Sequence, residues 1–127
     1  MAAKRYNPLS PPNAKRWLAE DDAEKMDRVM RSHRREGLDA SQLKVHATLH
    51  TIVENQIAMG HATPVAEAID RLMAEGLDRH EAIHAVASKL TEHLWDILHV
   101  ETQPSEDLHE PYFDAVRQLT AEEWLNS

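Results

Sequence analysis

The sequence predicts an all-α protein, organised as a single helical bundle of about four main helices with a short C-terminal helical extension. Of the 127 residues, 42% are hydrophobic but only 5% are aromatic, so the expected core is aliphatic. β-branched residues form no run long enough for a strand. The chain has only three glycines, and each falls where a helical pattern ends. Together these features favour helices over sheets.

The chain is expected to form one domain over residues 1–127. Residues 1–12 contain three of the six prolines and are expected to be an extended lead-in. Asn13 is a good N-cap for a short helix that holds Trp17. Residues 101–127 are expected to form the C-terminal extension.

The first two long helices follow the lead-in. One is expected over residues 21–36, because its apolar positions have helical spacing and Gly37 follows it. The next is expected over residues 40–59, with Asp39 as N-cap and Gly60 as the stop. The apolar faces of these two helices are expected to include Met26, Val29, Met30, Leu43, Leu49, Val53 and Ile57.

Two more helices are expected in the middle of the chain. Thr63 followed by Pro64 is typical of an N-cap and first helical residue, which predicts a helix that runs to Glu75. Asp78 is expected to begin the longest helix, over residues 79–100. The residues expected to face the core are Val65, Ile69, Leu72 and Met73 in the first of these helices, and Ile83, Val86, Ala87, Leu90, Leu94 and Ile97 in the second.

The C-terminal extension is also expected to be partly helical. Pro111 is suited to the start of a fifth helix that carries Tyr112 and Val116. Thr120 and Glu123 have the spacing of a capping box for a last turn that includes Trp124.

Composition excludes several kinds of partner. The formal net charge is −8, which disfavours binding to the phosphate backbone of nucleic acids. No apolar stretch approaches the length of a membrane span, and the N-terminal residues lack the apolar core of a signal peptide. A cytoplasmic protein is therefore expected. A homodimer through an exposed face of the longest helix is possible, and no small-molecule substrate is indicated.

Two spaced sets of polar residues stand out within the expected helices. The first is His46, His50 and Glu54, each four residues from the next, and the second is His80 and His84. Residues four apart lie on one face of a helix, so each set can aim its side chains at one point. Because the chain has no cysteine, a metal here would take nitrogen and oxygen ligands. The two sets predict a site for a divalent transition metal, zinc or iron first, with manganese, nickel and cobalt also compatible.

Further residues are candidates for the same site. His33 closes the apolar row of the first long helix, so it could be another ligand, although a histidine also suits a helix C-terminus through the helix dipole. Asn55 and Gln56 follow Glu54, and either could hydrogen-bond a ligand.

Glu81 allows a different interpretation. His80-Glu81-x-x-His84 matches the zinc-peptidase pattern, in which the glutamate is the general base. In this second hypothesis the protein is a zinc-dependent hydrolase with Glu81 as catalytic residue and a third ligand from residues 46–54. However, Asp78 and Glu81 also form a capping box, which would turn the Glu81 carboxylate toward the backbone and away from a metal.

Two other arrangements compete with a site for one metal or for a histidine-rich pair of metals. A carboxylate-bridged dinuclear centre needs two Glu-x-x-His motifs, and only Glu81-x-x-His84 is present. A third hypothesis is a non-catalytic interaction or scaffold bundle, in which the histidines pair with each other and with carboxylates. Removal of metal should leave the stability of such a bundle unchanged.

The two motif regions also resemble a known family. The stretch from His46 to Ala58, with its run V-E-N-Q-I-A, and the stretch from Glu75 to Ala85, with its run R-H-E-A-I-H, resemble a family of small bacterial proteins classed as a domain of unknown function. The resemblance implies a compact helical fold and no particular activity. It also implies that Glu81 need not be glutamate, which favours a site built on His46, His50, Glu54, His80 and His84 over a peptidase.

Overall fold

A computed structural model describes residues 6–33, 39–99 and 109–127 of the chain. These residues form seven α-helices, one short 3₁₀ turn and no strand, which confirms the all-α prediction. None of the described helices is long and apolar enough to cross a membrane. The elements are α1 (Ala14–Ala19), α2 (Asp22–His33), α3 (Ala40–Ala58), the 3₁₀ turn η2 (Gly60–Ala62), α4 (Val65–Ala74), α5 (Arg79–His99), α6 (Glu110–Gln118) and α7 (Ala121–Leu125).

Polar side chains fix several helix starts, as the sequence indicates. The Asn13 side chain accepts a hydrogen bond from the backbone of α1. Asp39 and Gln42 form a complete capping box at α3, and Thr120 caps α7. Each of these contacts satisfies a backbone N–H that has no partner inside the helix.

A few boundaries differ from the expected ones. Helix α4 begins at Val65 rather than Pro64, and the hydroxyl of Thr63 accepts a hydrogen bond from the Val65 N–H at 3.2 Å. Gly76 lies just after the C-cap residue of α4 and has a φ of 114°, a conformation that favours glycine. The last expected turn of the first long helix, over residues 34–36, and the expected helix end at residue 100 lie outside the described residues.

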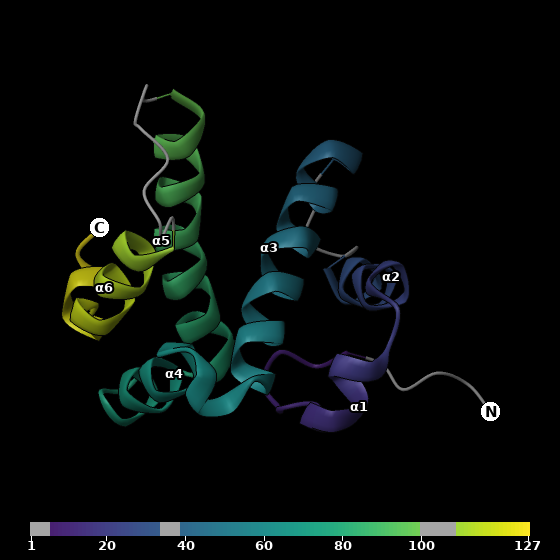
Figure 1. Cartoon of the computed structure of the whole chain (residues 1–127), viewed down its shortest axis with the longest axis horizontal. Helices are drawn as coiled ribbons and strands as arrows, with labels where there is room; N and C mark the ends of the chain where they lie inside the picture. The colour runs from purple at the N-terminus through teal and green to yellow at the C-terminus, as the bar shows by residue number, and fades with distance from the viewer. Residues whose placement is uncertain (1–5, 34–38, 100–108) are drawn as a thin grey trace.

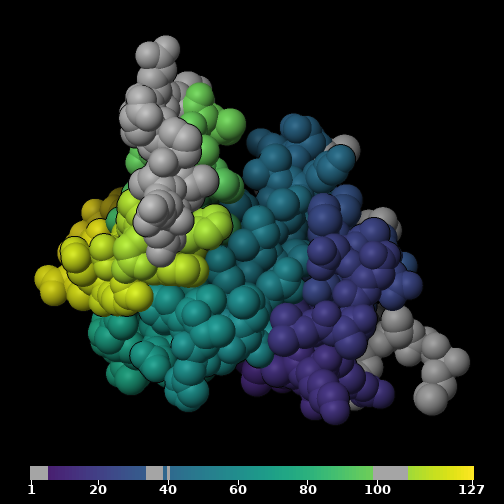
Figure 2. All heavy atoms as spheres, viewed as in Figure 1, coloured from purple at the N-terminus to yellow at the C-terminus, as the bar shows by residue number. Residues whose placement is uncertain are grey.

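Helix α3 lies at the centre of the arrangement (Figure 1). It contacts α1 and α2 on one side and α4 and α5 on the other, while α6 packs against α4 and α5. The described N-terminal residues and α1–α2 therefore occupy one side of the molecule in Figure 2, and α4–α7 occupy the other. Among the described helices, α3 thus has extensive contacts with both halves.

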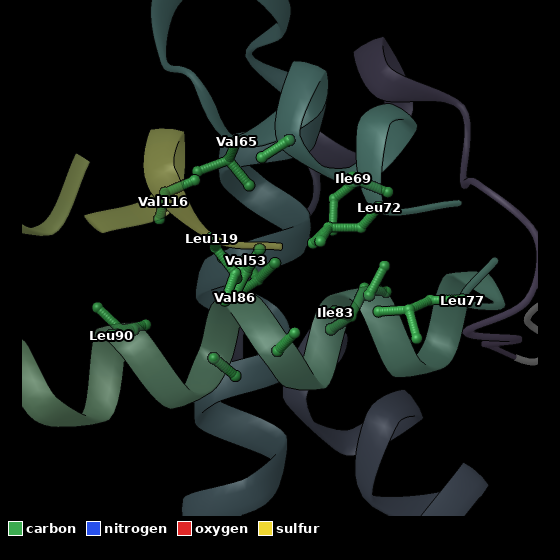
Figure 3. Packing of buried hydrophobic residues seen from close by; sticks show 14 of the residues in the cluster. Val53, Val65, Ile69, Leu72, Leu77, Ile83, Val86, Leu90, Val116 and Leu119 are labelled. Atoms are coloured by element: carbon green, nitrogen blue, oxygen red, sulfur yellow. The ribbon is translucent and has the colours of Figure 1, made fainter. Parts of the chain in front are cut away.

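The apolar core is divided in the same way. The larger cluster joins α3, α4, α5, α6 and α7, and Figure 3 shows Val53, Val86 and Leu119 meeting near its middle. A smaller cluster on the α1–α2 side contains Tyr6, Trp17, Val29 and Ala47. Burial of each aliphatic side chain contributes roughly 1.5–3 kcal/mol before entropy is counted.

Three residues expected in the core are instead exposed. Met73 is 41% exposed at the end of α4, and Leu94 and Ile97 are each 40% exposed in the C-terminal half of α5. This half of α5 continues away from α3 (Figure 1), so its apolar positions have fewer neighbours among the described residues. Binding of a second copy of the chain to this half of α5, in a homodimer, stays a prediction.

Candidate metal centre

Five histidines from three helices meet at one place. His33 is the last residue of α2, His46 and His50 lie one turn apart on α3, and His80 and His84 lie one turn apart on α5. One ring nitrogen from each can be chosen so that all five atoms lie within 4.8 Å of one another. Among the described residues, this is the one group of histidines and carboxylates close enough to hold a metal ion.

The helical framework explains the convergence. The i, i+4 spacing places each histidine pair on one face of its helix. Helix α3 packs against both α2 and α5, so the row on α3 lies between the other two contributions. His33 and His50 are each only 1% exposed, while His46, His80 and His84 are half-buried. The cluster therefore runs from the interior toward solvent.

The ring nitrogens form two close pairs. Nε2 of His33 lies 3.3 Å from Nε2 of His80, and Nε2 of His50 lies 3.1 Å from Nε2 of His84. Zn–N bonds of 2.0–2.1 Å in a tetrahedral site place neighbouring nitrogens about 3.3 Å apart. Both pairs therefore have the separation of two ligands on one ion, although an N–H···N hydrogen bond has a similar length.

The hydrogen bond on the far side of His33 fixes its tautomer. Nδ1 of His33 lies 2.8 Å from the carbonyl oxygen of Val29, and this oxygen can only accept. The hydroxyl of Ser32 donates to the same carbonyl at 2.7 Å. Nδ1 of a neutral His33 must therefore carry the hydrogen, and Nε2 has its lone pair facing the cluster.

A similar argument applies to His50. Its Nδ1 lies 3.2 Å from the hydroxyl oxygen of Tyr6, which lies 2.5 Å from a carboxylate oxygen of Glu54. A hydroxyl has a single hydrogen, and an ionised carboxylate only accepts, so Tyr6 donates to Glu54. The Tyr6 oxygen can then only accept from Nδ1–H of His50. Nε2 of neutral His50 is again left with its lone pair toward the cluster.

Glu54 lies differently from its expected place. It is outside the histidine group, and both of its oxygens are bound by Arg79, Oε1 by Nη2 at 2.7 Å and Oε2 by Nη1 at 2.8 Å. Both side chains are buried, and such a bidentate pair is a strong charge-assisted interaction. Glu54 thus supports His50 through Tyr6, whereas the sequence suggested direct ligation. Sequence reasoning missed Arg79 and Tyr6, because neither has a spacing that points to the histidines.

Burial favours the neutral form of two of the five histidines, His50 and His84. Burial, followed by the nearby His33, His46, His84 and His80, lowers the pKa of His50 to about 2. Burial, followed by His80 and His46, lowers the pKa of His84 to about 4. Neutral imidazoles are the form that binds metal ions.

The structure places Glu81 at the surface. Its carboxylate accepts a hydrogen bond from the indole N–H of Trp124 at 2.8 Å, and its backbone N–H donates to the Asp78 side chain at 2.8 Å. Asp78 therefore caps α5 as expected. The Glu81 carboxylate contacts α7 in place of the return contact to the Asp78 backbone.

The two amides after Glu54 have structural contacts instead of contacts to the histidines. The Asn55 side-chain oxygen accepts hydrogen bonds from Trp17 at 2.8 Å and from Lys25 at 2.9 Å. Gln56 accepts one from the Tyr112 hydroxyl at 2.7 Å. Asn55 thereby joins α3 to the N-terminal half, and Gln56 joins it to α6.

The other described histidines lie outside the cluster. His61 is exposed in η2 and pairs with Glu67 at 3.2 Å. His93 is buried and stacks on Tyr112, while His109 precedes α6. None of the three belongs to the group that could hold an ion.

The structure thus defines an all-helical protein with a partly buried cluster of five histidines. The chain belongs to the family described as "Domain of unknown function (DUF1841)", whose model matches residues 23–118. This match confirms the resemblance to a family of unknown function, and it spans all five clustered histidines but not Tyr6. Comparisons with curated proteins and with solved structures found no match.

Proposed function

We propose that this protein binds one divalent transition-metal ion through the five-histidine cluster of α2, α3 and α5. The observation that carries the proposal is the convergence of five ligand atoms within 4.8 Å. Each neutral imidazole has one ring nitrogen with a free lone pair, and the five chosen nitrogens lie close enough together to act on one ion. A cation would satisfy several lone pairs at once.

The tautomers support the same proposal. His33 and His50 each hold their Nδ1 hydrogen through an outer acceptor, which leaves the Nε2 lone pair toward the centre. Metal-binding histidines generally donate their other ring N–H to a carbonyl, a carboxylate or a similar partner. The Val29 carbonyl and the Tyr6 hydroxyl provide such partners here.

A single ion fits the cluster better than two. All five ligand atoms lie within 4.8 Å of one another, and a small inward movement brings them within the roughly 4.2 Å that separates opposite ligands of one ion. A carboxylate-bridged dinuclear centre is disfavoured, because the buried carboxylate beside the cluster, Glu54, is engaged by Arg79 and Tyr6.

The donor set bears on the kind of metal. Imidazole nitrogen suits zinc, iron, nickel, cobalt and copper, and the absence of cysteine removes thiolate ligands. We place zinc and iron first, as the sequence indicates. Zinc in four-coordinate form would use four of the five imidazoles, whereas iron could use all five and keep a sixth position for water.

The contacts of Glu81 bear on the hydrolase alternative. A general base must lie within hydrogen-bond reach of the metal-bound water. The Glu81 carboxylate instead accepts from Trp124 at the surface, so we favour metal binding without Glu81 as base. A Glu81→Gln variant that keeps its metal but loses a hydrolytic activity of the wild type would reverse this preference.

The test is metal content. Protein purified without an affinity tag or chelator should contain close to one equivalent of metal by elemental analysis, and the His50→Ala/His84→Ala double variant should contain almost none. His61→Ala and His93→Ala are the controls, one exposed and one buried, and both should keep the metal.

Two results would contradict the proposal. One is wild-type protein that remains free of metal even after incubation with zinc or ferrous iron and removal of the excess. The other is a double variant that binds as much metal as the wild type while it remains folded by circular dichroism. Either would leave the histidines as a set of mutual hydrogen bonds.

A further inference from the structure

Tyr6 lies on the segment before α1, yet it reaches the centre of the molecule. Its side chain is 8% exposed, and its ring centroid is 5.9 Å from that of Trp17 and 6.0 Å from that of His50. The ring meets His50 nearly edge-on, at 85°. The hydroxyl of Tyr6 is therefore the outer neighbour of a candidate metal ligand.

A closed chain of hydrogen bonds holds this hydroxyl in place. Tyr6 donates to Glu54, Glu54 is bound at both oxygens by Arg79, and Nη1 of Arg79 also donates to the carbonyl of Pro8 at 3.0 Å. This series of hydrogen bonds thus begins at the Tyr6 side chain and ends at the backbone of Pro8, two residues further along the sequence. Arg79 fixes both the carboxylate that orients Tyr6 and the segment that carries it.

We infer that Tyr6 is a positioning residue of the metal site, so that docking of the segment over residues 6–8 and metal binding strengthen each other. This inference rests on the proposed function. With Tyr6 docked, Nδ1 of His50 has an acceptor, and the tautomer with a free Nε2 is favoured. Without that acceptor, the hydrogen can move to Nε2, where it blocks coordination.

Coupling in one direction requires coupling in the other. If docking of the segment raises the affinity for metal, bound metal must favour docking by the same factor. The segment lies outside the residues that the family model matches, so this part of the site is carried by the N-terminal residues of this chain. The chemistry involved is ordinary support of a ligand by its hydrogen-bond partner, which typically changes metal affinity 10–100-fold.

The first experiment compares the Tyr6→Phe and Tyr112→Phe variants with the wild type. Tyr6→Phe keeps the ring and removes only the hydroxyl. Tyr112→Phe is the matched control, because Tyr112 is also buried and its hydroxyl donates to a side-chain oxygen, that of Gln56, outside the cluster. Zinc affinity is measured by competition with a chromophoric chelator. We expect binding about 10–100-fold weaker for Tyr6→Phe and within about twofold of wild type for Tyr112→Phe.

A second measurement reads the tautomer directly and separates positioning from general destabilisation. Long-range ¹⁵N–¹H spectra of the zinc-free wild type should show His50 with the hydrogen on Nδ1. Tyr6→Phe should move His50 toward the Nε2–H form and leave His33 unchanged, because His33 donates to the Val29 carbonyl. Loss of folding alone would alter both histidines.

The outcomes distinguish this inference from the proposal on which it rests. Wild type that does not bind zinc overturns both. Wild type that binds zinc, with a Tyr6→Phe variant of equal affinity, overturns only the role of Tyr6. A wild-type His50 with its hydrogen on Nε2 before zinc is added also overturns that role, even if the Tyr6→Phe variant proves too unstable to study.

Discussion

At the scale of single residues, the cluster is governed by the cost of charging buried imidazoles. The pKa values of His50 and His84 are lowered to about 2 and about 4, first by burial and then by the neighbouring histidines. In the unfolded chain both side chains have ordinary pKa values near 6.5. The native protein without metal therefore binds fewer protons than the unfolded chain below about pH 6.5, down to about pH 4 at His84 and about pH 2 at His50.

This difference predicts how the stability of the metal-free protein depends on pH. Because the unfolded chain takes up the protons, stability is complete above about pH 6.5 and falls as the pH is lowered toward 4. Between pH 7.5 and 5.0 we expect a loss of about 2 kcal/mol from His50 and a smaller loss from His84, which is partly open to solvent. Urea unfolding with chelator present at the two pH values measures it.

A matched variant separates the contribution of these two histidines from that of the other ionisable groups of this acidic chain. His50→Asn/His84→Asn should show a smaller decrease in stability between the two pH values, whereas the exposed-site variant His61→Asn should follow the wild type. Equal pH dependence in all three proteins would show that the two buried histidines are not the groups responsible.

At the scale of helices, the Glu54–Arg79 pair joins the C-terminal part of α3 to the first residue of α5. Both side chains are buried, so neither charge has water as an alternative partner. Removal of one member of such a pair leaves the other charge uncompensated in a medium of low dielectric constant. Removal of one partner is therefore expected to lower the free energy of unfolding by more than the intact pair contributes to it.

Arg79→Met is accordingly expected to destabilise the protein by about 3–5 kcal/mol in chemical denaturation. The double variant Glu54→Leu/Arg79→Met should lose less than Arg79→Met alone, since no buried charge remains. Arg117→Met, which removes an exposed arginine paired with Glu110 and Asp114 on α6, should leave the midpoint of unfolding close to that of the wild type. A double variant as unstable as the single one would mean that packing, and not charge, dominates here.

The helices themselves were largely predictable from the sequence, because caps and periodicity are local signals. Asn13, Asp39 and Thr120 cap helices as expected. The expected burial of Leu94 and Ile97 was wrong, since periodicity shows which face of a helix is apolar but not where its neighbours end.

The site was predictable only in part, for the same reason. The spacing of histidines on α3 and α5 indicates a shared point, and the structure brings those four together with His33. The pairing of Glu54 with Arg79 depends on how α3 and α5 pack, and the approach of Tyr6 depends on the path of a segment with no periodicity. Neither is encoded in local spacing.

At the scale of the whole molecule, the histidines lie where two cores meet. The larger core joins α3–α7, and the smaller one holds Tyr6, Trp17, Val29 and Ala47. Helix α2 packs mainly against α3, and His33 brings it to His80 of α5. A bound ion would join α2 to α3 and α5 through bonds much stronger than these apolar contacts.

Metal should therefore protect one side of the molecule selectively. In hydrogen exchange followed by mass spectrometry, zinc is expected to slow exchange in α2 and in residues 6–10, while α6 and α7 change little, because neither of these contributes a ligand. Uniform slowing across all helices would indicate that zinc acts only through global stability. No change in α2 would indicate that His33 does not bind the ion.

The position of Trp17 has an optical consequence. Trp17 is 2% exposed, and the cationic groups of Lys25 and Arg28 lie over its ring. The ring of Tyr6 contacts both Trp17 and His50, so it links the indole to the histidine cluster. Trp95 is 62% exposed and Trp124 is half-buried, so Trp17 should emit at the shortest wavelength of the three. An ion with an open d shell at the histidines would quench that emission through space, whereas zinc, with a filled shell, would not. The fluorescence of Trp17 would therefore distinguish bound zinc from a bound open-shell ion such as iron.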